Sequence, residues 1–208
     1  MKMMHRRKFI TGTMITLPAV AVHLSSGVAS AQRGEYKNDL EILNFALVAE
    51  YFLSQFYREA NVGLSSLEER LVADIGADED VHIASITRTL QNLGEAPVRA
   101  PAINFGNALS SRERMLRFAL KFENLFAGAY LGAAGSIQSR DVLVAAAGIL
   151  GVEERHAAVI ATLLGAPAEG GVFEGSLQKP ATKDQVLASL KPYIKGAASA
   201  ADDAAVTL

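Results

Sequence analysis

The sequence contains one pattern twice, and this internal repeat is the feature that most limits how the chain can fold. Residues 45–57 resemble residues 118–130 after a shift of 73, and residues 79–86 resemble residues 153–160 after a shift of 74. Nearly equal shifts mean that one unit of two linked segments occurs twice. Two such units facing each other would bring equivalent residues opposite one another.

Each unit is predicted to be a helical hairpin. Apolar residues at helical spacing, bounded by capping residues, predict helices at about 39–60, 65–93, 110–135 and 141–164. Short turns join the first two helices and the last two, whereas residues 94–109 form a long connection that can run the ~30 Å length of a bundle. No segment is typical of a strand. We therefore expect an all-α four-helix bundle with one long crossover between its second and third helices.

The first 31 residues are predicted to be a removable export leader. Basic residues precede an apolar stretch, and Ala29-Ser30-Ala31 offers a small-residue cleavage site. The stretch is well short of the ~20 residues that span a membrane. Arg6-Arg7-Lys8-Phe9-Ile10 resembles the twin-arginine export motif, with an ordinary Sec leader as the alternative. We expect an exported, periplasmic or otherwise extracytoplasmic protein with no membrane span after cleavage.

The rest of the chain divides into two parts. We assign residues 32–167 to the four-helix bundle and residues 168–208 to a C-terminal extension. Within the extension, Thr182 caps a short predicted helix at 183–190, and a mobile tail is expected from Gly196.

Composition excludes several kinds of chemistry. The 208 residues include no cysteine, which excludes disulfides, cysteine-based zinc sites and iron–sulfur centres. The leader holds four of the 20 basic residues, so 16 remain against 22 acidic ones, a net charge of −6. We therefore expect no nucleic-acid partner. The leader also holds His5 and His23, which leaves His82 and His156 as the remaining histidines.

Both remaining histidines stand three residues after a glutamate, a spacing that puts the two side chains on one helix face. The other two helices each carry a glutamate inside an apolar stretch. Four carboxylates balance the charge of two divalent ions, and oxygen with imidazole ligands suits iron or manganese. The predicted ligands of this dinuclear metal site are Glu50, Glu79, His82, Glu123, Glu153 and His156. Without metal we expect raised carboxyl pKa values and a less stable fold.

Other polar residues receive weaker assignments. Tyr57 and Tyr130 lie two turns beyond Glu50 and Glu123, and are candidates for a catalytic role, either by hydrogen bonding to metal-bound carboxylates or by supplying an electron. The alternative is that they only pack. Surface or supporting positions are expected for Asp80 and Glu154, and solvated positions for Glu68, Glu69 and Glu113.

The six residues and the long crossover resemble the ferritin-like superfamily, and in particular exported ferritin-like proteins related to desiccation-related proteins. The resemblance implies two Fe or two Mn ions that react with peroxide or dioxygen, as in ferroxidases, peroxidases and catalases. It also implies a homodimer as one form of assembly. Two alternatives stay open: a catalytically silent stress-related structural or metal-sequestering protein, and a bundle without metal. Fold alone does not decide between these activities.

Overall fold

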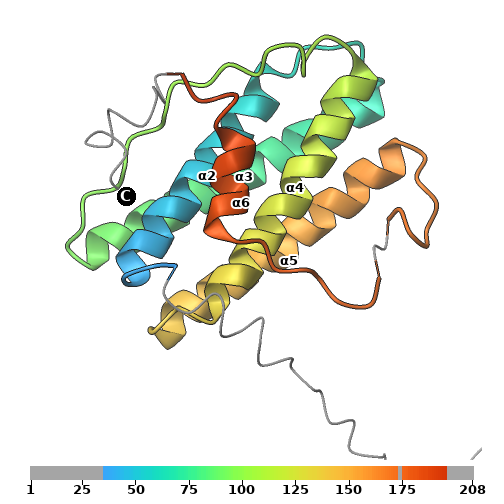
Figure 1. Ribbon diagram of the computed structural model, residues 1–208. Coiled ribbons are helices and arrows are strands. Elements are labelled where there is room, and N and C mark those ends of the chain that lie inside the picture. The colour runs from blue at the N-terminus through green and yellow to red at the C-terminus, as the bar shows by residue number, and fades with distance from the viewer. Residues whose placement is uncertain (1–34, 173–174, 196–208) are drawn as a thin grey trace, which may run out of the picture.

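The computed structural model describes residues 35–172 and 175–195, and in this part of the chain the fold is helical, as predicted. The predicted leader and the predicted mobile tail lie outside the described residues. The described residues form four long helices and one short one, arranged as Figure 1 shows. Their bounds are α2 Asp39–Glu59, α3 Ser66–Asn92, α4 Arg112–Ala134, α5 Arg140–Leu163 and α6 Lys183–Leu190. None of these described helices is long and apolar enough to cross a membrane.

Each helix begins where a polar side chain satisfies a backbone N–H that the first turn leaves free. The residues that accept these hydrogen bonds are Asn38, Ser65, Ser111, Ser139 and Thr182. After α3 and α5, the chain turns away through Gly94 (φ 79°) and Gly165 (φ 72°). These left-handed conformations favour glycine, so the sequence ends both helices by local chemistry.

The helices form two antiparallel hairpins, α2 with α3 and α4 with α5, and the crossover at 93–111 joins them (Figure 1). The crossover packs on the bundle through buried Ile103 and Phe105. Its backbone also pairs with the chain that follows α6, in an isolated antiparallel bridge between Ile103 and Ile194. The expected arrangement of short turn, long crossover and short turn is therefore confirmed.

One solvated position was predicted wrongly. Glu68 is 7% exposed, and it both caps α3 at Ser65 and accepts hydrogen bonds from Arg112, the first residue of α4. Arg112 also donates to the backbone oxygen of Leu163 at the end of α5, at 2.7 Å. These contacts tie three helix ends together. Arg112 lies 44 residues from Glu68, so no local pattern could indicate the pair.

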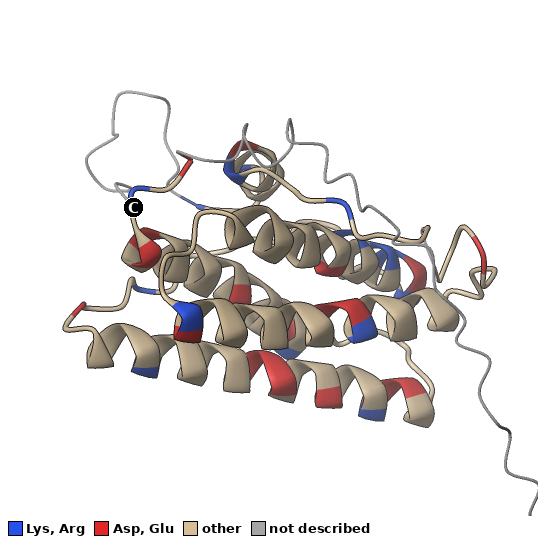
Figure 2. Cartoon of the chain, turned by 90° about the horizontal axis from the view of Figure 1, so that it is seen from below, with Lys and Arg blue, Asp and Glu red and all other residues tan. Residues whose placement is uncertain are grey.

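Aromatic side chains fill the space between α2 and α4. The ring centroids of Phe52 and Phe122 are 4.7 Å apart, and those of Phe56 and Phe118 are 4.6 Å apart. Phe105 of the crossover lies 5.2 Å from Phe52 and from Phe56. Figure 2 shows long uncharged stretches along the bundle helices. Any ionisable side chain inside such a core needs a specific partner, because burial disfavours its charge.

The short helix α6 lies against α4 (Figure 1). The segment leading to it runs close to α4 at Gly128, whose carbonyl accepts a 2.8 Å hydrogen bond from the N–H of Ala181. A Cβ atom at Gly128 would lie only 2.9 Å from the carbonyl oxygen of Lys179. Val186 and Leu190 of α6 are buried in the aromatic core. The extension therefore covers the bundle on its α4 side.

Candidate metal centre

The structure brings the six predicted ligand residues together in the middle of the bundle. Glu50 comes from α2, Glu79 and His82 from α3, Glu123 from α4, and Glu153 and His156 from α5. The four carboxylates are at most 1% exposed, and the two imidazoles are 6% and 4% exposed. Such burial is rare for glutamate unless it is paired or bound to a cation. These side chains are therefore not a solvated helix face.

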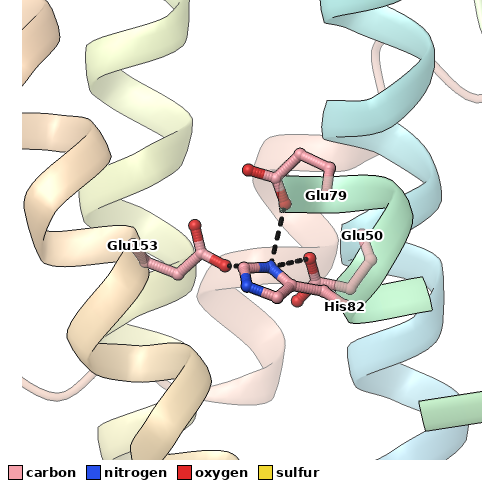
Figure 3. A group of neighbouring side chains, drawn as sticks. All are labelled: Glu50, Glu79, His82 and Glu153. Carbon is pink, nitrogen blue, oxygen red and sulfur yellow. Dashed lines mark hydrogen bonds and ion pairs between the residues drawn. The ribbon is translucent and has the colours of Figure 1, made fainter. Parts of the chain in front are cut away.

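The six residues divide into two overlapping groups, each with ligand atoms within 4.8 Å of one another. Figure 3 shows the first group, in which the Nδ1 atom of His82 faces three carboxylates. It lies 3.3 Å from Glu50, 3.3 Å from Glu79 and 3.1 Å from Glu153. In the second group, Nδ1 of His156 is the central atom. It lies 3.0 Å from Glu79, 3.5 Å from Glu123 and 3.2 Å from Glu153.

Two carboxylates, Glu79 and Glu153, belong to both groups. Glu79 presents Oε2 to His82 and Oε1 to His156, while Glu153 presents Oε1 to His82 and Oε2 to His156. Each shared carboxylate thus turns one oxygen toward each group. Glu50 belongs only to the first group and Glu123 only to the second. The arrangement has the approximate two-fold symmetry that the sequence repeat predicts.

Several of the carboxylate oxygens lack hydrogen bonds. Among the described residues, Glu79 Oε1, Glu123 Oε2 and Glu153 Oε1 are buried and accept no hydrogen bond. All three point into the cluster, within 3.5 Å of an imidazole nitrogen. A buried acceptor without a donor costs free energy, on the order of 1–3 kcal/mol. Hard divalent cations satisfy carboxylate oxygens of this kind, so the donor set fits iron or manganese.

The ionisation of the cluster follows from burial and from the imidazoles. Burial raises the pKa of Glu50 and Glu123 well above the ordinary value, and the charge on Glu153 raises both further. Burial acts in the same direction on Glu153, but its close contacts with the imidazoles of His156 and His82 outweigh burial and lower the pKa of Glu153 to about 2. The expected rise in pKa therefore applies to Glu50 and Glu123 but not to Glu153.

The imidazoles respond to the same contacts. Burial alone would lower the pKa of His82, but its close contacts with the carboxylates of Glu153, Glu50 and Glu79 outweigh burial and raise the pKa to about 12. The pKa of His156 is raised for the same reason, with Glu123 as its strongest partner. Two imidazolium protons thus offset part of the negative charge when no metal is bound. Metal ions would have to displace these protons.

The two tyrosines bind carboxylates across the bundle. Tyr57 on α2 donates its hydroxyl hydrogen bond to Glu123 on α4, and Tyr130 on α4 donates to Glu50 on α2. Burial raises both phenol pKa values well above 10, and the negative charges of the facing glutamates add to this effect. Both hydroxyls therefore stay protonated as donors. Each tyrosine orients the glutamate of the opposite hairpin, whereas sequence spacing only placed it on the face of its own helix.

Other polar contacts lie around the cluster. Asp80 is exposed on the surface, where it accepts hydrogen bonds from Ser54 at 2.7 Å and Arg58 at 3.0 Å. Glu154 is partly buried, and burial raises its pKa. Sequence reasoning missed Asp78, whose Oδ2 atom lies 3.2 Å from Nε2 of His156. Its position four residues before His82 was a signal that could have placed it on the inner edge of α3.

A comparison with protein families agrees with this arrangement. The model of a family described as a ferritin-like domain matches residues 38–166, from the cap of α2 to just beyond α5. The chain belongs to the ferritin-like domain family. No curated protein matches the sequence. In ferritin-like di-metal proteins, two helices each supply one glutamate, and the other two each supply a Glu-x-x-His pair. The same inventory is present here on α2 to α5.

Proposed function

We propose that this ferritin-like protein binds two Fe or two Mn ions in the six-residue cluster. The observation that supports the proposal most is the sharing of Glu79 and Glu153, each of which turns one oxygen toward each group. Carboxylates placed in this way can bridge two cations. Glu50 with His82 would complete one position, and Glu123 with His156 the other. When bound, such ions supply redox equivalents and Lewis acidity.

We propose further that the loaded protein is an oxidoreductase that acts on peroxide or dioxygen, of the ferroxidase, peroxidase or catalase type. The residues around the cluster support small uncharged substrates. Tyr130 borders an apolar cavity whose wall includes Ile86 and Ile149, which would admit dioxygen more readily than a charged metabolite. Tyr57 and Tyr130 hold Glu123 and Glu50 through protonated hydroxyls. A phenol can also supply an electron, and both phenols contact carboxylates of the cluster.

A second candidate function is metal binding without turnover, in a structural or metal-sequestering protein. The near-complete burial of the four carboxylates favours it, because a closed cluster holds ions well but limits access to them. Both functions need the same ligands, so only turnover separates them. Zinc in natively purified protein would favour the silent role.

The test of turnover compares metal-loaded protein with a variant that cannot hold the ions. Peroxide consumption and Fe(II) oxidation are measured for the wild type, for the double variant Glu50→Ala/Glu123→Ala, and for Glu113→Ala as a control on an exposed residue. We expect activity in the wild type and the control, and its loss in the double variant. Equal rates in all three proteins would refute the proposed oxidoreductase function. Bound metal without turnover would support the silent role.

We also propose that the protein works outside the cytoplasm, after export through the leader at 1–31. The support is the sequence of the leader alone, with Arg6 and Arg7 in the twin-arginine position. Twin-arginine export moves folded proteins, which would allow metal to be loaded before export. Cell fractionation of the wild type and of Arg6→Lys/Arg7→Lys tests this proposal. Cytoplasmic retention of the wild type would contradict it.

A further inference from the structure

The two halves of the cluster differ at one pair of equivalent positions. The 74-residue shift that relates Glu79 to Glu153 also relates Asp78 to Val152. The first hairpin therefore carries a carboxylate immediately before its Glu-x-x-His step, and the second carries an isopropyl group. All six candidate ligands obey the repeat, but this neighbouring pair does not.

The difference changes the hydrogen bonding of the two imidazoles. The ring of His156 turns Nδ1 to the cluster and Nε2 to Asp78, whose Oδ2 atom lies 3.2 Å away. By the two-fold relation, the matching contact to His82 would come from position 152 on α5. Valine offers no acceptor there. Within residues 35–172 and 175–195, no group makes a hydrogen bond with Nε2 of His82.

A hydrogen-bond acceptor at Nε2, which faces away from the cluster, changes the ability of Nδ1, which faces the cluster, to bind metal. A carboxylate that accepts the Nε2–H bond selects the tautomer with a free Nδ1 lone pair, fixes the ring orientation and makes Nδ1 a better electron donor. Removing such a partner lowers metal affinity roughly 10–100-fold. The side chain of Asp78 is 57% exposed, so water weakens the contact, and an effect near the lower end is expected.

We propose that the two metal positions are unequal, and that Asp78 is the positioning residue that makes the His156 position the tighter one and the first to fill. The inference rests on the proposed binding of two ions, and it adds the order in which the two ions bind. His82, which has only its inner contacts, would hold the second ion more weakly. The same ligand set would then provide one retained ion and one exchangeable ion.

Repulsion between two bound cations would also lower the affinity for the second ion, even in a symmetric site. The decisive comparison is therefore between variants that change the hydrogen bond and variants that change only charge. Asp74 is exposed one turn before Asp78 on α3, and within the described residues its side chain makes no hydrogen bond or ion pair. Asp74→Ala therefore removes the same charge from the same helix without touching an imidazole.

The experiment titrates metal-free protein with Mn(II) under anaerobic conditions and follows free Mn(II) by electron paramagnetic resonance. We expect two binding steps in the wild type. Asp78→Ala should weaken the first step roughly tenfold, while Asp74→Ala changes it much less. Val152→Asp gives His82 an acceptor and should strengthen the second step. Anomalous diffraction at one equivalent of Mn(II) should place the ion beside His156 in the wild type.

Each other outcome has a clear meaning. Equal effects of Asp78→Ala and Asp74→Ala would overturn the inference, as would a first ion beside His82. Two ions would still be bound in that case, so the proposed function would stand. Absence of any Mn(II) binding by the folded wild type would overturn both. Circular dichroism confirms folding of each variant, and because Asp78 is exposed, Asp78→Ala tests the inference even where Val152→Asp fails to fold.

Discussion

Metal removal is predicted to cost this protein much of its stability. Ions that bind only the folded state stabilise it by about 2.7 kcal/mol each when their free concentration is 100 times Kd, so two ions contribute roughly 5 kcal/mol. For a domain of this size, 1 kcal/mol corresponds to a shift in Tm of about 2–4 °C. Chelation should therefore lower Tm by roughly 10–20 °C. Differential scanning calorimetry of metal-loaded and chelated protein measures the shift directly.

A matched variant separates this effect from general weakening. In Glu50→Gln/Glu123→Gln, the amide oxygens still accept hydrogen bonds from Tyr130 and Tyr57, but two buried ionisable groups are gone. Raised pKa values in the folded state mean that metal-free wild type loses stability as pH rises above the unfolded value of about 4.3. The variant avoids that loss.

At neutral pH, the metal-free variant should therefore be more stable than the metal-free wild type, and it should respond little to added metal. The order of the two proteins reverses when metal is present. An unchanged Tm of the wild type after chelation would show that metal does not stabilise the fold. A metal-free variant that is less stable than the metal-free wild type would contradict the predicted cost of the two buried carboxylates.

Four further predictions concern single contacts in the bundle and the binding of metal. Tyr130→Phe leaves an oxygen of Glu50 without its donor and should lower the free energy of unfolding by about 1–3 kcal/mol in urea denaturation. Arg112→Ala should lower it by less, about 1 kcal/mol, because the Arg112 side chain is 39% exposed and Glu68 keeps its hydrogen bonds from Ser65. Gly128→Val should detach α6, seen as faster hydrogen exchange of its amides, whereas unchanged exchange would contradict the close approach. Metal affinity should rise with pH around neutrality, with proton release in calorimetry, because ions displace protons from imidazoles whose pKa values are raised.

The sequence was sufficient to predict the helices and the candidate ligands. Capping residues such as Ser65 and Thr182 lie next to the segments they start, so local chemistry determines the helix ends. Three-residue spacing likewise puts Glu79 and His82 on one face whatever surrounds them. The repeat then supplied Glu50 and Glu123 as partners, and the structure brings all of these side chains into one cluster.

Contacts between helices could not be predicted in the same way. Glu79 and Glu153 belong to both ligand groups only because of how α3 and α5 are placed along each other, and because of the direction in which each carboxylate points. The hydrogen bonds that Tyr57 and Tyr130 each donate to a glutamate of the opposite hairpin depend on the separation of α2 and α4. Spacing along one helix carries no information on either quantity.

The wrong assignment of Glu68 has a related cause. A glutamate in the first turn of a helix is typically solvated or serves as part of a capping box, and Glu68 does cap Ser65. Its second role appears only because the crossover returns the chain so that Arg112 lies beside it. Asp78 was missed for the same reason, since its partner His156 lies 78 residues further along the chain.

The proposed dinuclear site is tested most directly by the amount and the position of metal in protein purified from its native source. Elemental analysis combined with anomalous diffraction would give the number of ions for each chain and their location. We expect two Fe or two Mn ions, one beside His82 and one beside His156, with Glu79 and Glu153 between them. A folded native protein with no ion in this cluster, or with its metal bound elsewhere, would contradict this expectation.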